Sequence, residues 1–211
     1  MEEPFEGPGV RGVLHRPDAG NGHALVLTHG AGSNCQAPLL ARLSRAFESA
    51  GYLVLRYDLP FRQQRPSGPP FPVGAARDRE GIASAAELVR KLAHGRLIVG
   101  GHSYGGRQSA VLAATSPQLA DALLLLSYPL HPPKQPENRR TAFFPELRIP
   151  ALFVHGTNDP FASLEELRDA MALIPAHTDL LAVESAGHDL KRAADLANEV
   201  IARLETCAAT R

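Results

Sequence analysis

The sequence is poor in several features that mark other classes of protein. It has no tryptophan and only two cysteines, Cys35 and Cys207, so at most one disulfide could form and a cysteine framework cannot hold the fold together. Basic and acidic side chains each number 22, which gives a formal net charge of zero. This balance provides no electrostatic attraction for nucleic acid or an anionic membrane. The composition therefore favours a small neutral molecule as the partner.

Long apolar runs are also missing. The best candidate, ALLLLSYPL, has the length of a core strand and is too short to span a membrane. The first residues, MEEPFEGPGVRG, are acidic and contain prolines where a secretory signal needs a basic end and an apolar stretch. Together with the low cysteine content, these features predict a soluble cytoplasmic protein.

Short apolar runs do recur, and each is followed by turn residues and a longer segment of helical periodicity. This alternation predicts an α/β fold in which a mostly parallel sheet is covered by helices on both faces. A chain of 211 residues can enclose one substantial core, so we expect a single domain over residues 1–211. Strands are expected near residues 23–30, 52–58, 96–103, 121–129, 150–156 and 178–185. Helices are expected over Ala37–Ala50, Gly74–Ala93, Gly105–Thr115, Leu164–Leu173 and Leu190–Glu205.

Two proline-rich segments, residues 59–74 and 129–147, interrupt this rhythm. They have no clear period and are predicted to be loops. Each follows an expected strand, and in an open parallel sheet the loops after the carboxyl ends of strands surround the ligand crevice. We therefore expect both segments to form walls of a binding site.

One serine has a setting typical of a catalytic nucleophile. The sequence GHSYG, residues 101–105, follows the apolar run LIVG and precedes GRQSAVLAA, which has helical character. A G-x-S-x-G sequence between a strand and a helix predicts a nucleophile elbow, with Ser103 in a strained turn and its hydroxyl exposed. Glycine at positions 101 and 105 would avoid collisions with neighbouring backbone. The alternative interpretation is a glycine-rich turn with an incidental serine.

A serine hydroxyl needs a base to take its proton and an acid to orient that base. Asp159, in LFVHGTNDPF, and His188, in VESAGHDLKRA, both follow expected strands and come after Ser103 in the order serine, acid, histidine. Asp58, which ends the run LRYD, is the competing acid. Asp159 is preferred because Gly156 and Pro160 fix the turn that contains it.

Other histidines could also reach this edge of the sheet. His29, His102 and His155 each end a strand and could suggest a metal site, but no H-x-H or H-E-x-x-H spacing supports one. The elbow would direct His102 away from the hydroxyl of Ser103. His155 precedes the acid and is expected to be a structural hydrogen-bonding group.

The negative charge of a tetrahedral intermediate requires hydrogen-bond donors. One expected donor is the backbone N–H of Tyr104, directly after the serine. The second is expected from THGAGSN, with the backbone N–H of Ala31 preferred over that of Gly32.

With these residues identified, the chain resembles the α/β-hydrolase superfamily, and most closely its small dienelactone-hydrolase-like and testis-expressed hydrolase-like members. The blocks that carry the resemblance are THGAGSN, RYDLPFRQ, GGHSYGGRQSA, LFVHGTNDPF and AGHDL, in this order. The resemblance implies an eight-stranded core, with Ser103, Asp159 and His188 as the triad and Ala31 and Tyr104 as the oxyanion donors. Dienelactone hydrolases proper have cysteine at the elbow, so their lactone specificity does not transfer to this serine-containing chain.

The segment 129–147 stands where many esterases and lipases carry a helical lid, so the site is expected to be open, with an apolar wall from Phe61, Tyr128, Phe161 or the Phe143–Phe144 pair. These features predict a serine hydrolase that cleaves a small carboxylic ester or thioester through an acyl-enzyme, without cofactor or metal. The alternative is a binding or scaffold protein that keeps the fold without turnover. The sequence does not predict the oligomeric state.

Overall fold

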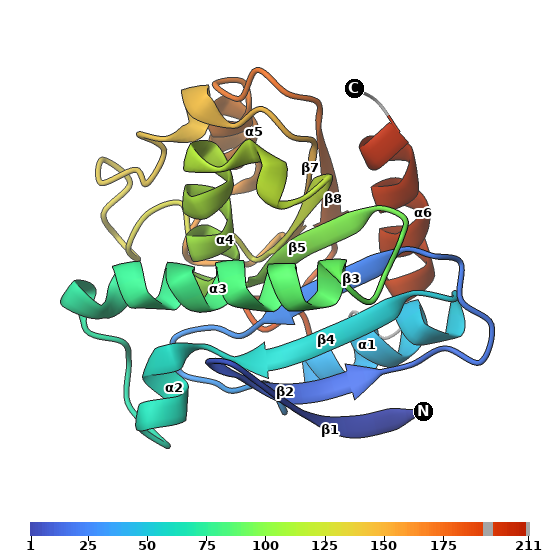
Figure 1. Cartoon of the computed structure of the whole chain (residues 1–211). Coiled ribbons are helices and arrows are strands. Elements are labelled where there is room, and N and C mark those ends of the chain that lie inside the picture. Colours follow the sequence, from blue (N-terminus) through green and yellow to red (C-terminus); the bar gives the residue numbers. More distant parts are fainter. Residues whose placement is uncertain (192–195, 210–211) are drawn as a thin grey trace.

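The computed structural model describes residues 1–191 and 196–209, which form one eight-stranded sheet with helices on both faces (Figure 1). In spatial order the strands are β1 (Glu2–Gly7), β2 (Val10–His15), β4 (Leu53–Asp58), β3 (Ala24–Thr28), β5 (Leu97–His102), β6 (Ala122–Leu126), β7 (Ala151–Gly156) and β8 (Thr178–Val183). In this order, β1 and β2 are antiparallel to their neighbours, and each later neighbouring pair, from β4 to β8, is parallel. The α/β fold with a mostly parallel sheet is confirmed.

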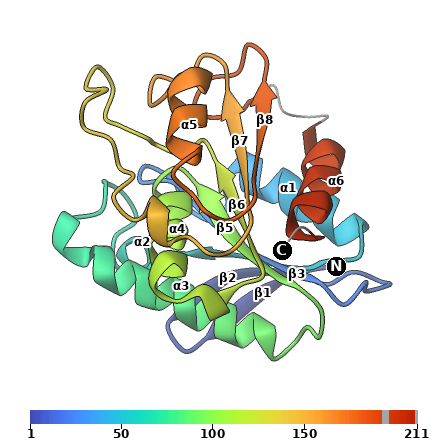
Figure 2. The same cartoon turned by 90° about the horizontal axis from the view of Figure 1, so that it is seen from above.

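The helices lie in two layers, as Figure 2 shows. α1 (Pro38–Ser49) and α6 (Leu196–Ala209) cover one face, and α3 (Ala75–Arg90), α4 (Tyr104–Thr115) and α5 (Leu164–Met171) cover the other. Alternate residues of β3 enter the two cores: Val26 packs on the side of α3 and α4, and Leu25 and Leu27 pack on the side of α1. Because both faces are covered, the central strands are apolar throughout.

The strands expected from apolar runs are all present, each a little shorter than its run. The expected helices are present as well, but the last one differs at its start. Leu190 has φ of 50°, which is incompatible with a right-handed helix, and Lys191 lies in a turn. Residues 192–195 of the expected helix lie outside the described residues, and α6 continues to Ala209.

The pattern of apolar runs did not indicate the first two strands. β1 is the edge strand and alternates exposed and half-buried residues, so it carries no apolar run, and its edge position tolerates Pro4. The segment 59–74 contains a short helix that sequence analysis assigned to a loop, α2 (Pro60–Gln64), which begins at a proline.

The parallel register brings the carboxyl ends of the central strands to one edge. Thr28 at the end of β3 pairs with Gly101, and His102 at the end of β5 pairs with Leu126. The segments that follow these strands therefore converge above this edge. No helix among the described residues is long and apolar enough to cross a membrane.

Candidate active site

The turn from β5 into α4 holds Ser103 in an unusual backbone conformation. Its φ of 50° and ψ of −115° lie outside the regions that side-chain-bearing residues normally adopt. Such a conformation costs on the order of 1–3 kcal/mol and persists only where the surrounding structure enforces it. The strained turn expected from GHSYG is confirmed.

The flanking glycines allow the close approach that this turn requires. A Cβ atom on Gly101 would lie 2.5 Å from the carbonyl oxygen of Thr28, and one on Gly105 would lie 2.6 Å from that of His29. Both distances are shorter than any real carbon–oxygen contact, and both neighbouring atoms belong to the backbone. The explanation for these two glycines is therefore confirmed.

A chain of hydrogen bonds joins the three side chains that sequence analysis selected. The Oγ atom of Ser103 lies 2.8 Å from Nε2 of His188, and Nδ1 of His188 lies 2.8 Å from Oδ2 of Asp159. Since a carboxylate oxygen only accepts, Nδ1 of His188 carries the hydrogen and Nε2 is free to accept from the serine hydroxyl. This is the tautomer that general-base catalysis by His188 requires.

Asp159 is almost fully buried, with 6% of its surface exposed. Burial alone would raise the pKa of its carboxyl group, but the hydrogen bond and charge of His188, the charge of His155 and the backbone N–H of Phe161 outweigh it and lower the pKa. The carboxylate is therefore ionised at neutral pH. It can hold the His188 ring and stabilise an imidazolium.

The competing acid, Asp58, belongs to a different network. Its Oδ1 atom accepts a hydrogen bond from the backbone N–H of Cys35 at 2.7 Å, in the segment that follows β3. Nearby, Nε2 of His29 accepts from the backbone N–H of Leu59. Asp58 thus anchors a loop, as expected if Asp159 is the acid of the triad.

His102 and His155 both support the site without pointing at the serine. Nε2 of His102 donates to the backbone carbonyl of His188 at 2.7 Å, and Nε2 of His155 donates to the carbonyl of Ala162 at 3.1 Å. Burial lowers the pKa of His102 to about 4, so this ring is neutral at pH 7. The elbow motif predicts that His102 points away from the hydroxyl, but no sequence signal indicates its contact with the backbone of His188.

The backbone N–H groups of Tyr104, directly after Ser103, and of Ala31 have no protein acceptor among the described residues. The loop that carries Ala31 passes directly over the elbow, since a Cβ atom on Gly30 would lie 3.4 Å from Cβ of Ser103. Ala31 lines the same cavity as Ser103, whereas Gly32 is not among its lining residues. These positions favour Ala31 over Gly32 as the second donor.

A buried arginine that sequence analysis did not select holds this loop. Arg62 of α2 is 5% exposed, and its guanidinium donates to the carbonyl oxygens of Ser33 at 2.7 Å and Ala31 at 3.0 Å. It also donates to the carbonyl oxygens of Arg65 and Gly68. The planar fork of the guanidinium suits several acceptors at fixed angles. The one sequence signal was its position just after a strand, in the block RYDLPFRQ.

Ser103 opens into a cavity of about 560 Å³, within the usual range for sites of small molecules. Pro69, Pro70 and Phe71 from the segment 59–74, and Pro129 and Arg140 from the segment 129–147, line it. The expectation that both segments form walls is confirmed. Between β6 and β7 the chain forms one short 3₁₀ turn, Phe144–Glu146, and no helical lid.

Most of the aromatic residues expected in the wall lie elsewhere. Phe161 lines the cavity and packs on the ring of His188, with 4.3 Å between the ring centroids. Tyr128 and Phe144 are buried in the core instead, where they pack against each other. Phe61 lies beneath the site, against Tyr104. Aromatic type and loop position alone could not separate lining from core packing.

Comparison with known proteins identifies the fold and the family. A family model described as "Alpha/beta hydrolase domain" matches residues 21–210. The chain therefore belongs to the α/β-hydrolase family.

Solved structures with the same fold include dienelactone hydrolase from Anabaena variabilis, at 19% sequence identity and a TM-score of 0.75, covering 97% of this chain and 98% of that one. A lidless α/β serine hydrolase from Xanthomonas campestris is 18% identical, with a TM-score of 0.77 and coverage of 98% and 94%. Est1E from Butyrivibrio proteoclasticus is 16% identical, with a TM-score of 0.78 and coverage of 99% of both chains. At these identities the likeness establishes the fold alone.

Proposed function

We propose that this protein is a serine hydrolase that cleaves small carboxylic esters or thioesters through an acyl-enzyme intermediate. The observation that carries the proposal is the continuous chain of hydrogen bonds from Ser103 through His188 to Asp159, at 2.8 Å for each step, at the wall of a cavity. Family membership supports a hydrolase, and Est1E has been solved with a carboxylic acid, ferulic acid, bound.

In this mechanism Ser103 Oγ attacks the carbonyl carbon while His188 Nε2 takes the hydroxyl proton. The backbone N–H groups of Ala31 and Tyr104 stabilise the oxyanion, and the loss of one such donor costs about 3 kcal/mol in comparable sites. His188 then returns the proton to the leaving alcohol or thiol. A water molecule, deprotonated by His188, attacks the acyl-enzyme and releases the acid. Asp159 keeps the imidazole in the required tautomer throughout.

The thiols do not compete with Ser103 as nucleophiles. Burial raises the pKa of Cys35 to about 12 and that of Cys207 to about 11, so neither forms the reactive thiolate at neutral pH. Both thiols are buried and unpaired, which suits a reducing compartment. On this ground we propose a cytoplasmic location.

The direct test is labelling with a fluorophosphonate, which forms a covalent bond only with an activated serine. We expect stoichiometric labelling of the native protein, with the adduct on the peptide that contains Ser103, and faster hydrolysis of short p-nitrophenyl esters than of long ones. Failure to label, together with no turnover of esters, thioesters or amides, would instead favour a non-catalytic binding protein.

Arg62 provides a test of the oxyanion loop. Arg62→Gln removes donors to the carbonyls of Ala31 and Ser33, so we expect kcat for p-nitrophenyl acetate to fall about tenfold or more, with a smaller change in KM. Steady-state kinetics and thermal unfolding should be measured together, with Arg62→Lys as the conservative variant and the exposed Arg77→Gln as the control. A normal kcat in a folded Arg62→Gln variant would show that the loop holds its position without this side chain.

A further inference from the structure

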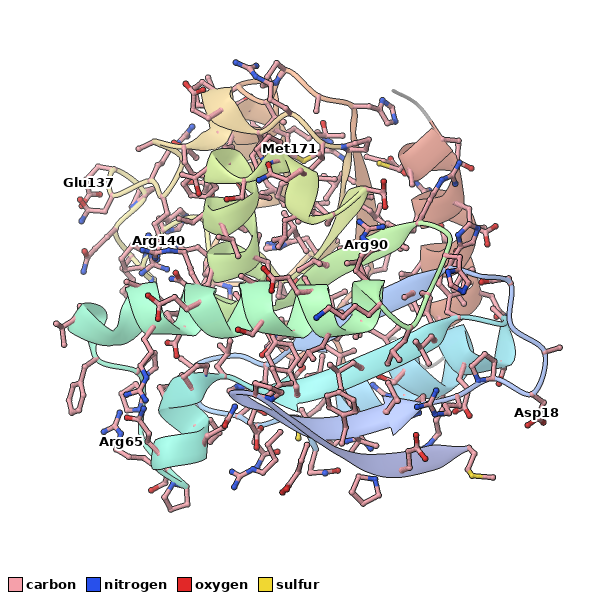
Figure 3. All side chains as sticks on the ribbon, in the orientation of Figure 1. Asp18, Arg65, Arg90, Glu137, Arg140 and Met171 are labelled. Carbon is pink, nitrogen blue, oxygen red and sulfur yellow. The ribbon has the colours of Figure 1, made fainter. Side chains whose placement is uncertain are left out.

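One wall of the cavity beside Ser103 is strongly basic. Arg79 of α3, Arg107 of α4 and Arg140 of the segment between β6 and β7 all line it, and none of the described residues that line it is acidic. Figure 3 labels Arg140 on this segment, beside α3 and α4. The zero net charge of the whole chain conceals this local concentration of positive charge. The composition alone had favoured a neutral partner.

These arginines differ from others of the chain in what they contact. Arg90 pairs with Asp121, Arg203 with Asp179, and Arg56 with Glu2. In contrast, within residues 1–191 and 196–209, none of the three arginines of the cavity has a carboxylate within ion-pair distance. Each of the three guanidinium groups carries a positive charge, because arginine is not deprotonated in proteins.

Neutral groups fix the directions of the basic side chains. Nη1 of Arg79 donates to Oε1 of Gln108 at 2.9 Å, and Gln108 is 1% exposed, so a buried amide orients this guanidinium. Nη1 of Arg140 donates to the carbonyl oxygen of Pro129 at 3.1 Å. The backbone carbonyl of Arg140 in turn accepts from the buried hydroxyl of Tyr128 at 2.6 Å. These contacts use part of the donor capacity of each arginine and leave the rest for another group.

The Nε atom of Arg107 is buried and has no hydrogen-bond acceptor of any kind among the described residues. Burial lowers the pKa of the Arg140 guanidinium, and the positive charge of Arg107, which lines the same cavity, lowers it further. Asp78, which precedes Arg79 in the chain, is 1% exposed and already accepts hydrogen bonds from the Tyr104 hydroxyl and the backbone N–H of Phe61.

A fixed cluster of like charges with a buried unsatisfied donor is costly unless an anion binds to it. The forked geometry of guanidinium groups matches the oxygens of a carboxylate or a phosphate, and such charge-assisted bonds are among the strongest in proteins. The cavity, at about 560 Å³, has room for a scissile carbonyl at Ser103 and an anionic group against this wall.

We propose that Arg79, Arg107 and Arg140 form a subsite for an oxoanion carried by the substrate, so that the preferred ester or thioester is acidic. The inference rests on the proposed hydrolase function of Ser103 and adds the substrate class. The oxoanion is a carboxylate or a phosphate group located away from the scissile bond.

Matched pairs of substrates test the subsite. On the acyl side, the mono-4-nitrophenyl ester of glutaric acid is compared with 4-nitrophenyl pentanoate. On the leaving-group side, 4-acetoxybenzoate is compared with 4-methylphenyl acetate. We expect the native protein to favour the anionic member of at least one pair. Arg107→Gln and Arg140→Gln should each lower the anionic-to-neutral ratio of kcat/KM about ten- to a hundredfold.

The control is Arg139→Gln, which removes the same charge from the exposed residue next to Arg140 and outside the cavity lining. It should leave the ratio unchanged. Thermal unfolding verifies that each variant is folded. If Arg107→Gln does not fold, the ratio is compared between the native protein and Arg140→Gln alone. The subsite would be overturned if the anionic-to-neutral ratio of kcat/KM were near one in the native protein, or equal in the native protein and all folded variants. Turnover of the neutral esters would still support the hydrolase proposal in that case.

A binding experiment separates the subsite from catalysis and distinguishes the two anions. Calorimetric titration of the Ser103→Ala variant with glutarate and with inorganic phosphate should show binding of at least one, weakened about tenfold or more by Arg140→Gln and unaffected by Arg139→Gln. Binding without turnover of any ester would support the subsite and overturn the proposed function. Absence of binding by both anions would overturn the subsite.

Discussion

Replacement of Ser103 by alanine should abolish turnover. We expect kcat for p-nitrophenyl acetate to fall by about 1,000-fold or more, because the acyl-enzyme cannot form and the remaining acceleration comes from binding and the oxyanion donors alone. Fluorophosphonate labelling should disappear in the same variant. The backbone strain at φ 50° is enforced by the elbow, and alanine retains Cβ, so the melting temperature should change little.

The matched control is Ser84→Ala on α3, where the serine is half-buried and does not line the cavity. It should retain native kinetics. Undiminished hydrolysis by the Ser103→Ala variant, after purification that excludes contaminating esterases, would contradict the assignment of the nucleophile.

The second large effect is expected at the acid. Asp159→Asn should lower kcat by about 1,000- to 10,000-fold, because the amide can donate to His188 and so favours the tautomer whose Nε2 cannot accept the serine proton. KM should change far less, since Asp159 is buried behind the histidine. Steady-state kinetics over a pH range would measure both parameters.

Asp58→Asn is the natural comparison, because Asp58 is the competing acid and undergoes the same chemical change. Its carboxylate accepts from the backbone N–H of Cys35, and an amide oxygen can continue to accept there. We expect less than a tenfold loss of kcat. A much greater loss in Asp58→Asn than in Asp159→Asn would reverse the assignment of the acid.

Local features of the fold could be predicted from the sequence, because they depend on short-range packing and sterics. The buried parallel strands appear as apolar runs, and the elbow appears as glycines at the positions where a side chain would collide with backbone, as Gly101 and Gly105 show. Edge strand β1 could not be predicted from apolar runs, because every second side chain is exposed and the strand therefore contains no apolar run. The start of the last helix was also missed, since the left-handed conformation of Leu190 has no local signal such as glycine.

The order of Ser103, Asp159 and His188 could be inferred, but their distances could not. Positions 103 and 188 are 85 residues apart, and their contact depends on the register of strands β5 to β8. Asp58 ends β4, which pairs with β3 on the side away from β5, and its carboxylate contacts the loop after β3 instead of His188. The contacts that His102 and Arg62 make with backbone carbonyls have no signature in the sequence and were found only in the fold.

The sequence by itself determined the class of fold, the nucleophile elbow and the small set of side chains from which a triad could be drawn, because each follows from local periodicity and backbone sterics. Only the tertiary structure decided which acid meets the histidine and which loop residues line the cavity. It also placed Arg79, Arg107 and Arg140 around one space that no acidic side chain of the described residues lines. Those outcomes depend on how helices and loops distant in sequence converge at one edge of the sheet. Charges that cancel over the whole chain can then be separated in space.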